Sequence, residues 1–248
     1  MNEWLVILFF LVALIYSMAG FGGGSSYLAL LVLFAVPMAL VPPLALICNI
    51  AVVTVGGWRF IRDGHFQWKR LLPFLVTSIP FAFLGGRIVV DKQIFLLLLS
   101  GSLLCAGLNM LLAGRAEDSI QEIDSERLWK WGLPAGALLG GVSGLVGIGG
   151  GIFLSPLLHT LRWENSKQIA ASASVFIFVN SLSGLMGQLS KPMDPALLNG
   201  YLALPVAALA GGLLGSFWSS KKFSYVVVQR VTAVLVLYAS IRVGLSAF

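Results

Sequence analysis

The chain has 248 residues, of which 58% are hydrophobic and only 10% charged, and its mean hydropathy is +0.93. A soluble domain carries about a quarter of its residues as charged side chains. This composition therefore excludes a soluble enzyme, a disordered chain and a nucleic-acid-binding domain, although 16 Lys and Arg outnumber 10 Asp and Glu. Apolar stretches of spanning length recur along the chain and predict an all-α, polytopic membrane protein in contact with membrane lipids.

The first apolar region, residues 4–36, is too long for one ordinary span and contains the motif Gly20-Phe-Gly-Gly-Gly24. Divided at the glycines it gives pieces of 17 and 12 residues, about 25 and 18 Å long at about 1.5 Å per residue. Two short helices around a break predict either a re-entrant hairpin or a discontinuous helix. The second helix should begin at residues 25–27, with its free N–H groups directed back toward the glycines.

Three stretches of spanning length follow the first glycine motif, at residues 43–61, 71–90 and 93–113. Each has about the twenty residues that cross roughly 30 Å of hydrocarbon. The next segment, residues 115–128, is polar with mixed charges. We expect it to be a solvated linker in the cytoplasm.

The remainder of the chain repeats the first part. Gly147-Ile-Gly-Gly-Gly151 repeats the first glycine motif, and Asn180 repeats Asn49 at nearly the same separation along the chain. Leu214-Gly215 repeats Leu84-Gly85 in the same order. Further stretches of spanning length lie at residues 168–189, 199–218 and 223–243. We therefore divide the chain into repeats over residues 1–114 and 129–248, each with one glycine-broken unit and three full transmembrane helices.

The placement of Lys and Arg orients these repeats. If each glycine-broken unit returns to the side it enters from, eleven Lys and Arg lie at one face and four at the other; if each unit crosses once, the numbers are nine and six. The cytoplasmic bias of basic residues favours the hairpin. The two repeats are then inverted in the membrane with both termini outside, an architecture typical of secondary transporters.

The two glycine motifs are the main candidate site. A backbone break inside hydrocarbon is tolerated only where it is packed in protein or lines a cavity. The helix after each break starts with about half a positive charge, so two such starts can converge on one anion near mid-membrane. The glycines expected to offer amides are Gly22, Gly23, Gly24, Gly149, Gly150 and Gly151. The alternative is that they only permit close helix packing.

Five polar residues complete this candidate set: Ser25, Asn49, Asn180, Ser181 and Arg230. An amide in hydrocarbon either donates to a bound oxyanion or bonds a neighbouring helix. Arg230 is the one charge well inside a predicted span. Its guanidinium either pairs with an anion or reaches along the helix to the basic face.

Several kinds of chemistry find no support in the sequence. No Asp or Glu lies inside a predicted span, so the carboxylate relay of a proton-driven pump is absent. This predicts either electrogenic uniport or cotransport of a proton on the substrate itself. The glycine motifs fail the dinucleotide-binding pattern, since Ser25 and Ile152 stand where its last glycine is required. We therefore predict no enzyme activity, no catalytic residue, no metal site and no cofactor.

At these residues the sequence resembles the sulfite exporter TauE/SafE family, which is also grouped with the toluene sulfonate uptake permeases. The resemblance rests on Gly20-Phe-Gly-Gly-Gly24, on Gly144-Leu-Val-Gly-Ile-Gly-Gly-Gly151 followed by Pro156, and on the duplicated halves. It implies a bacterial or archaeal inner-membrane permease for small sulfur oxyanions or organosulfonates, such as sulfite and thiosulfate. The direction of transport differs between members and is not implied.

The expected function is therefore a secondary transporter that binds a small sulfur-containing anion between the two glycine-rich helix starts and works by alternating access. Two alternatives stay open: a permease for a cation or a neutral solute, and a non-transporting membrane scaffold or assembly partner. The expected partners are a small anionic substrate and membrane lipids, with no nucleic acid. Assembly into a homo-oligomer is left open.

Overall fold

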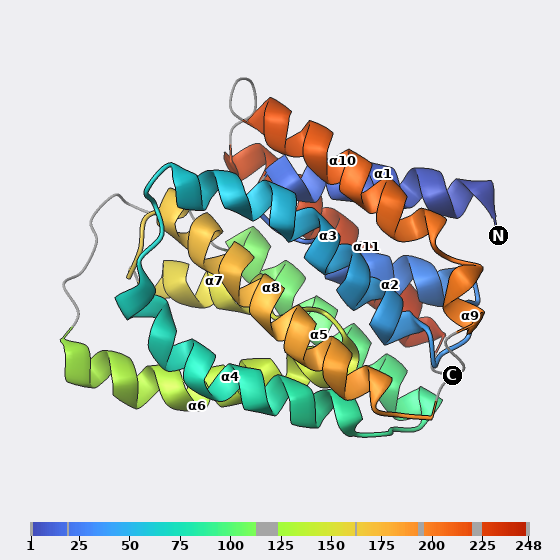
Figure 1. Cartoon of the computed structure of the whole chain (residues 1–248), viewed down its shortest axis with the longest axis horizontal. Helices are drawn as coiled ribbons and strands as arrows, with labels where there is room; N and C mark the ends of the chain where they lie inside the picture. Colours follow the sequence, from blue (N-terminus) through green and yellow to red (C-terminus); the bar gives the residue numbers. More distant parts are fainter. Residues whose placement is uncertain are drawn as a thin grey trace.

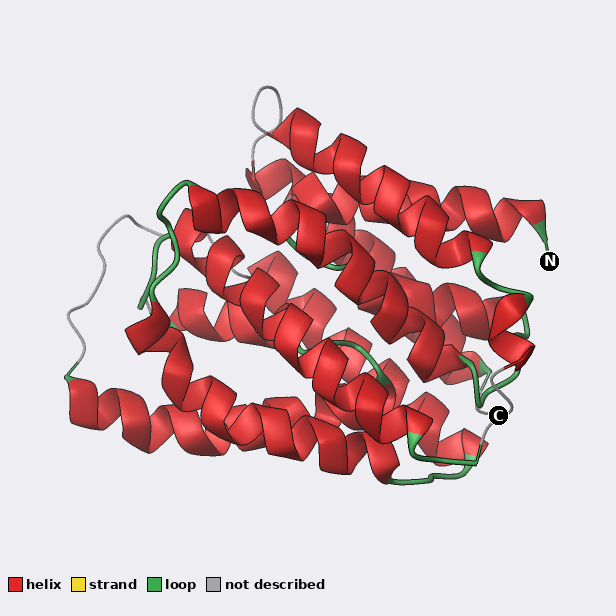
Figure 2. Ribbon diagram, in the orientation of Figure 1, coloured by secondary structure: helices red, strands yellow, loops and turns green. Residues whose placement is uncertain are grey.

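The computed structural model describes residues 2–18, 20–112, 124–161, 163–192, 196–219 and 225–246. All regular structure in these ranges is helical, which confirms the predicted all-α class (Figure 1, Figure 2). The helices are α1 (Glu3–Met18), α2 (Gly24–Leu33), α3 (Val41–Arg62), α4 (Trp68–Arg87), α5 (Lys92–Leu112), α6 (Ser125–Val146), α7 (Gly151–Thr160), α8 (Ser166–Leu189), α9 (Ala196–Asn199), α10 (Ala203–Ser219) and α11 (Tyr225–Leu245).

The observed helices follow the predicted spans with small shifts. The span predicted over residues 199–218 is α10, and the separate one-turn helix α9 precedes it. α6 begins at Ser125, inside the segment predicted as a linker over residues 115–128; residues 113–123 lie outside the described residues. Within the described ranges, α5 and α8 meet both the length and the hydropathy expected of a span, and five further apolar segments are shorter.

The two halves of the chain are interleaved. α4 packs against α6 and α8, and α10 packs against α1 and α3 (Figure 1). The remaining large contacts pair α3 with α8 and α5 with α11. Each contact has a counterpart in the other half. The contact of α4 with α6 corresponds to that of α10 with α1, and the contact of α4 with α8 corresponds to that of α10 with α3. The pairs α3 with α8 and α5 with α11 each join two corresponding helices. The two halves therefore share one arrangement of helices.

α4 and α6 run parallel and meet through glycines at every fourth position of α6: Gly132, Gly136, Gly140 and Gly144. A methyl group added at Gly132 would lie 2.6 Å from the Cβ of Pro73, and one added at Gly140 would lie 2.5 Å from the Cα of Ser78. Close backbone approach of this kind is a main source of helix association in lipid, where burial of apolar surface adds little.

α3 and α8 cross the molecule in opposite directions. Gly57, near the end of α3, lies against Ser174, near the start of α8. Leu46, near the start of α3, lies 3.6 Å from the position of a methyl group on Gly184, near the end of α8. Contacts between residues that ascend in one helix and descend in the other establish an antiparallel pair.

α5 and α11 are also antiparallel. The hydroxyl of Ser100 donates to the backbone carbonyl of Ser240 at 3.0 Å, and the hydroxyl of Ser240 donates to the carbonyl of Ser100 at 2.9 Å. Further along α5, Gly107 meets Leu237, which precedes Ser240 in α11. These reciprocal bonds satisfy two hydroxyls that would otherwise be costly in an apolar setting.

Each glycine break reverses the direction of the chain. The end of α1 lies against Gly56 of α3: a methyl group added to Gly56 would lie 3.6 Å from the Cβ of Ser17. The break then brings Gly22 and Gly24 back to Asn49, and α2 continues toward the start of α3. We call α1 and α2 the first hairpin.

The second hairpin, α6 and α7, folds in the same way against α8. Gly144, near the end of α6, lies by Gly184, whereas Gly151, at the start of α7, lies by Ile177. The chain has therefore turned back toward the start of α8. Of the two arrangements that the sequence left open, this geometry is a helical hairpin in both halves.

The helix directions give the molecule two different ends. The basic end holds the α3–α4 and α7–α8 turns and the starts of α6 and α8, with Arg62, Lys69, Arg70, Arg127, Lys130 and Lys167. The opposite end holds the termini of the described chain, and Figure 1 shows N and C on that side.

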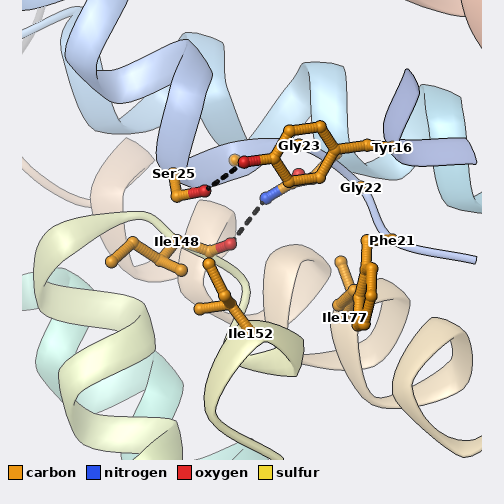
Figure 3. Close-up of a pocket in the computed structure, with 10 residues that line it drawn as sticks. Tyr16, Phe21, Gly22, Gly23, Ser25, Ile148, Ile152 and Ile177 are labelled. Carbon is orange, nitrogen blue, oxygen red and sulfur yellow. Dashed lines mark hydrogen bonds between the residues drawn. The ribbon is translucent and has the colours of Figure 1, made fainter. Parts of the chain in front are cut away.

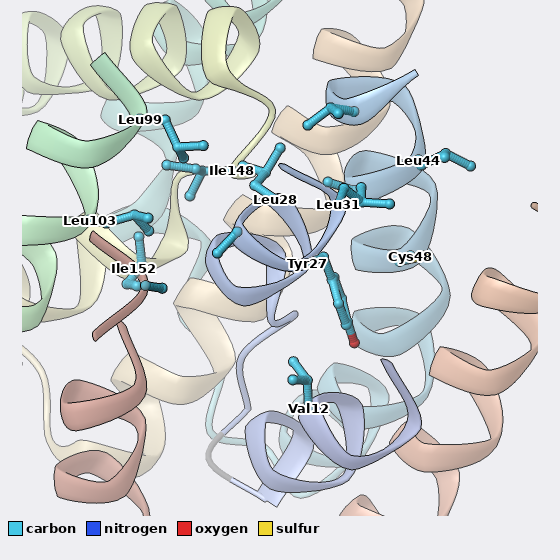
Figure 4. Packing of buried hydrophobic residues seen from close by; sticks show 14 of the residues in the cluster. Val12, Tyr27, Leu28, Leu31, Leu44, Cys48, Leu99, Leu103, Ile148 and Ile152 are labelled. Atoms are coloured by element: carbon cyan, nitrogen blue, oxygen red, sulfur yellow. The ribbon is translucent and has the colours of Figure 1, made fainter. Parts of the chain in front are cut away.

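The short helix α2 is enclosed by the rest of the protein. Tyr27, Leu28 and Leu31 are 0% exposed and pack within the same apolar core as Leu44 and Ile148 (Figure 4). The outward faces of the helices are apolar as well, since Leu138, Val206, Phe217, Tyr238 and Ile241 are among the exposed large side chains. Apolar surfaces inside and outside suit a protein surrounded by lipid.

Candidate functional site

Both hairpins start their second helix from a glycine in the left-handed conformation. Gly23, with φ +84°, caps α2, and Gly150, with φ +79°, caps α7. α2 begins at Gly24, one residue before the predicted start at residue 25, and α7 begins at Gly151. Neither cap has a side-chain hydrogen bond, so the N–H groups of each first turn have no side-chain acceptor from the cap.

Asn49 of α3 lies between the tips of the two hairpins and is 0% exposed. Its Nδ2 donates to the backbone carbonyl of Ile148 at 2.9 Å, a bond drawn in Figure 3. A methyl group on Gly24 would lie 2.5 Å from that same carbonyl oxygen, and one on Gly149 would lie 2.8 Å from Asn49 Nδ2. The two tips thus converge on one amide, and the first hairpin touches the second there.

A small cavity lies beside this amide. Its lining consists of Tyr16, Phe21, Gly22, Gly23, Gly24, Ser25, Asn49, Ile148, Ile152 and Ile177, and its volume is about 10 Å³ (Figure 3). That volume is room for about one water molecule. The helix starts do converge as expected, but Asn49 and Ile177 fill most of the space between them.

Hydroxyl groups add to the polar character of the cavity. The Tyr16 hydroxyl is hydrogen-bonded to Ser25 Oγ at 3.2 Å and to Ser26 Oγ at 2.8 Å. Around the tips, Asn49 Oδ1, Ser143 Oγ and Ser181 Oγ are buried without a partner among the described residues. The described residues that line the cavity are neutral, and they offer the hydroxyls of Tyr16 and Ser25, backbone amides and the unpaired Asn49 Oδ1. Nowhere in the described chain do three His, Cys, Asp or Glu side chains gather as they would around a metal ion.

The second half differs from the first at this point. A methyl group on Gly24 would meet Asn49, whereas one on Gly151, the corresponding glycine of the second hairpin, would meet Ile177. Ser181 lies nearby, with its Oγ 2.7 Å from the methyl position on Gly149. Asn180 donates instead to the Phe176 carbonyl of its own helix at 2.9 Å. The structure therefore brings Ser181 to the glycines, and the position that corresponds to Asn49 there is the apolar Ile177.

Arg230 is not brought to the hairpin tips. It lies on α11 with an exposed side chain, and the cavity beside Asn49 is lined by other residues. The guanidinium of Arg230 is therefore not among the described groups that line the cavity at the glycine motifs.

Residues 5–243 match the sequence model of the family described as Sulfite exporter TauE/SafE. The chain belongs to the TauE/SafE family. It is thus a multi-pass membrane protein of a transporter family, and the resemblance seen in the glycine motifs is confirmed.

Individual relatives of this TauE/SafE chain cover most of its length. A probable membrane transporter protein of Sinorhizobium fredii is 28% identical over 240 residues, 96% of each chain. One from Methanocaldococcus jannaschii is 27% identical over 216 residues, 83% of this chain and 79% of the relative. One from Xylella fastidiosa is 29% identical over 234 residues, 90% of this chain and 87% of the relative. No solved structure matches the chain.

Glu164 is a buried acidic residue that the sequence analysis missed. It lies in the turn between α7 and α8 and is 3% exposed. Burial raises its pKa to about 7, while the Ser172 hydrogen bond and the charge of Arg70 oppose the shift. The prediction that a carboxylate relay is absent concerned residues inside the predicted spans, and Glu164 lies outside them. The sequence signal that could have drawn attention to Glu164 was its place directly before Asn165, the residue that caps α8.

Proposed function

We propose that this TauE/SafE protein is a secondary transporter of a small sulfur-containing anion, such as sulfite, thiosulfate or an organosulfonate. The substrate binds between the tips of the two hairpins. The observation that carries the proposal is the convergence of two glycine-capped helix starts on the buried amide of Asn49. Each helix start contributes about half a positive charge. The family description, which names sulfite, supports this class of substrate.

The donors at this site are neutral groups. Asn49 Nδ2, the hydroxyls of Tyr16 and Ser25, and the first amides of α2 surround the cavity. An entering oxyanion takes the Asn49 donor from the Ile148 carbonyl and forms hydrogen bonds with the helix start. Because no Lys or Arg is among the described residues of the lining, the anion is held by dipoles, which leaves it weakly enough bound to depart.

Alternating access accounts for the small size of the cavity. A volume of about 10 Å³ cannot hold a sulfur oxyanion, so binding requires the hairpin tips to separate. We propose that the halves are inverted repeats that move against each other. The antiparallel pairs α3 with α8 and α5 with α11 support this, because symmetry-related helices of inverted repeats run in opposite directions.

The proposed orientation follows from charge. The basic end faces the cytoplasm of a prokaryotic cell, since Lys and Arg are retained on that side of the inner membrane. The termini then face the periplasm.

Flux of radiolabelled sulfite and thiosulfate into proteoliposomes tests the proposal. Wild-type protein should give saturable flux. Gly24→Ala should abolish it, because the added methyl group overlaps the Asn49 amide and lies 2.5 Å from the Ile148 oxygen. Gly101→Ala is the matched control, since nothing lies within 4 Å of its added methyl group.

Two further measurements address the alternatives. Competition by divalent cations but not by sulfur oxyanions would favour a cation permease. A purified protein that gives neither flux nor thermal stabilisation with sulfite, thiosulfate, sulfoacetate or phosphate would contradict transport and favour a scaffold. Equal flux in Gly24→Ala and wild type would remove the hairpin tips as the binding site.

A further inference from the structure

The turn between α7 and α8 joins the two halves at the basic end. The ring of Trp163, in this turn, lies 6.1 Å from the ring of Phe74 of α4. The guanidinium of Arg70, near the start of α4, donates to the backbone carbonyl of Trp163. α4 belongs to the first half and the turn to the second, so these two contacts close the interface between them.

Glu164 directly follows Trp163 in the chain, and the start of α8 fixes its position. Asn165 forms a capping box with Gln168, in which its side chain accepts from the backbone N–H of Lys167 and of Gln168. The preceding residue, Glu164, is thereby fixed with its carboxyl group inside the protein. The Ser172 hydroxyl donates to Oε1 at 3.0 Å, whereas the buried Oε2 has no partner among the described residues.

Among the residues that the structure describes, few charges surround this carboxyl group. Arg70 of α4 is the described charged group that acts on it. α7 contributes His159, which is half-buried, and α8 contributes the Ser172 hydroxyl. The charged side chains at the starts of α6 and α8, Glu126, Arg127, Lys130 and Lys167, are exposed.

We propose that Glu164 binds the proton that is coupled to anion transport. The inference rests on the transport function proposed above. With Glu164 neutral, Arg70 stays on the Trp163 carbonyl and the basic end stays closed. An ionised carboxylate in this buried place is costly and draws either Arg70 or water toward Oε2. Both events loosen the turn from α4, so loss of the proton lets the basic end open.

The proton is exchanged with water at the basic end: the O–H bond of the carboxyl group breaks as water takes the proton, and it re-forms when water returns one. The corresponding turn of the first half, residues 34–40, contains no acidic residue. Proton control is therefore confined to one end of the molecule. Since a group with a pKa of about 7 is half-protonated near neutral pH, both forms of Glu164 are populated under cellular conditions.

Transport at varied pH on the basic side tests the coupling. In wild-type proteoliposomes, flux of thiosulfate, which unlike sulfite does not itself titrate in this range, should change up to about tenfold between about pH 6 and about pH 8. Glu164→Gln mimics the neutral form and should keep its flux within about twofold over this range. A pH-sensitive dye inside the vesicles should report anion-dependent proton movement in wild type and none in Glu164→Gln. Glu126→Gln, at an exposed position of α6, should behave as wild type in both measurements.

Thermal unfolding in detergent tests the proton site without transport. The pKa of Glu164 is raised from 4.5 to about 7 by burial, so the folded protein binds this proton more tightly than the unfolded chain. Wild-type stability should therefore fall as pH rises from about 4.5 to about 7. Glu164→Gln should match wild type at the acidic limit and unfold at a higher temperature above about pH 7. An unchanged difference across this range would overturn the proton site.

The outcomes separate this inference from the function on which it rests. Absence of flux in wild type, at every pH, contradicts the transport function and the coupling together. Flux in wild type with the same pH dependence and proton movement in Glu164→Gln overturns the coupling and leaves the transport function standing.

Discussion

At the scale of single residues, the side chain that joins the two hairpins is Asn49. Its amide donates to the Ile148 carbonyl across 99 positions of sequence. This carbonyl lies in the glycine break and not within a helix. Asn180 bonds a carbonyl of its own helix, which already accepts from the backbone four residues on. The two asparagines therefore differ in what their loss leaves unpaired.

Replacing each asparagine by alanine measures this difference. Asn49→Ala should destabilise the protein by about 1–3 kcal/mol, the cost of a buried group left unsatisfied. Asn180→Ala should cost clearly less, because the Phe176 carbonyl keeps its helical bond. Thermal unfolding in detergent gives both values. Equal losses would show that the bond to Ile148 is not what distinguishes Asn49.

The residues of the candidate site were only partly predictable. Glycines mark breaks and left-handed caps, so Gly22 to Gly24 and their repeats were predictable from the duplicated glycine motif alone. Ile177 was not, because matching Asn49 with Asn180 compared residue types and missed a shift of three positions along α8. Tyr16 was missed as well, since an aromatic residue in an apolar run gives no sign of the hydroxyls it will meet.

At the scale of elements, a glycine can be required by conformation, by space or by both. Gly150 has φ +79° and Phe176 lies 2.8 Å from the position of its added methyl group. Gly64, in the α3–α4 turn, has φ +77° with nothing within 4 Å. Both substitutions to alanine incur about 1–2 kcal/mol of left-handed strain. Gly150→Ala should lose about 1–3 kcal/mol more from crowding, measured by thermal unfolding; equal losses would exclude a packing role.

The pairing of α4 with α6 gives a second prediction for elements. Gly140 faces α4, and an added methyl group there lies 2.5 Å from Ser78, whereas nothing lies within 4 Å of one added to the adjacent Gly141. Gly140→Leu should therefore prevent folding or lower the yield of monodisperse protein severely, because α6 cannot reach α4. Gly141→Leu should be tolerated. Size-exclusion profiles compare the two, and similar profiles would contradict close α4–α6 packing.

Helices were more predictable than their pairing. Apolar length and glycine position located nearly every helix, because crossing hydrocarbon requires a continuous backbone of fixed length. The separate helix α9 and the early start of α6 were missed, since neither lies in a stretch of spanning length, to which that constraint applies. The parallel contact between α4 and α6 depends on glycines spaced by four, a pattern that indicates a packed face but not its partner.

At the scale of the whole molecule, the interleaving of the halves limits how they can move. α4 lies among helices of the second half, and α10 lies among helices of the first. The halves therefore cannot separate as two free bundles, and alternating access requires sliding along shared faces. One such face is α5 with α11, where two reciprocal hydroxyl bonds join the halves.

Disulfide cross-links distinguish motion between the halves from motion within one. Cysteines at Ser100 and Gly244 would join α5 to α11, and cysteines at Ser17 and Gly56 would join α1 to α3 within the first half. The Cβ separation is 3.6 Å in both pairs, within the range of about 3.5–4.5 Å that a disulfide spans. Cys48 and Cys105 are free and are first replaced by alanine.

Oxidation of the α5–α11 pair should stop anion flux in proteoliposomes, and a reductant should restore it, because the cross-link ties the two halves. The α1–α3 pair should retain flux when oxidised, since α1 and α3 move together as parts of one half. Undiminished flux through the oxidised α5–α11 variant would mean that this face stays fixed during transport. Motion would then have to be confined to the hairpin tips and the basic end, where the bond from Asn49 to Ile148 and the contact of Arg70 with Trp163 are hydrogen bonds between the halves of the kind that opening must break.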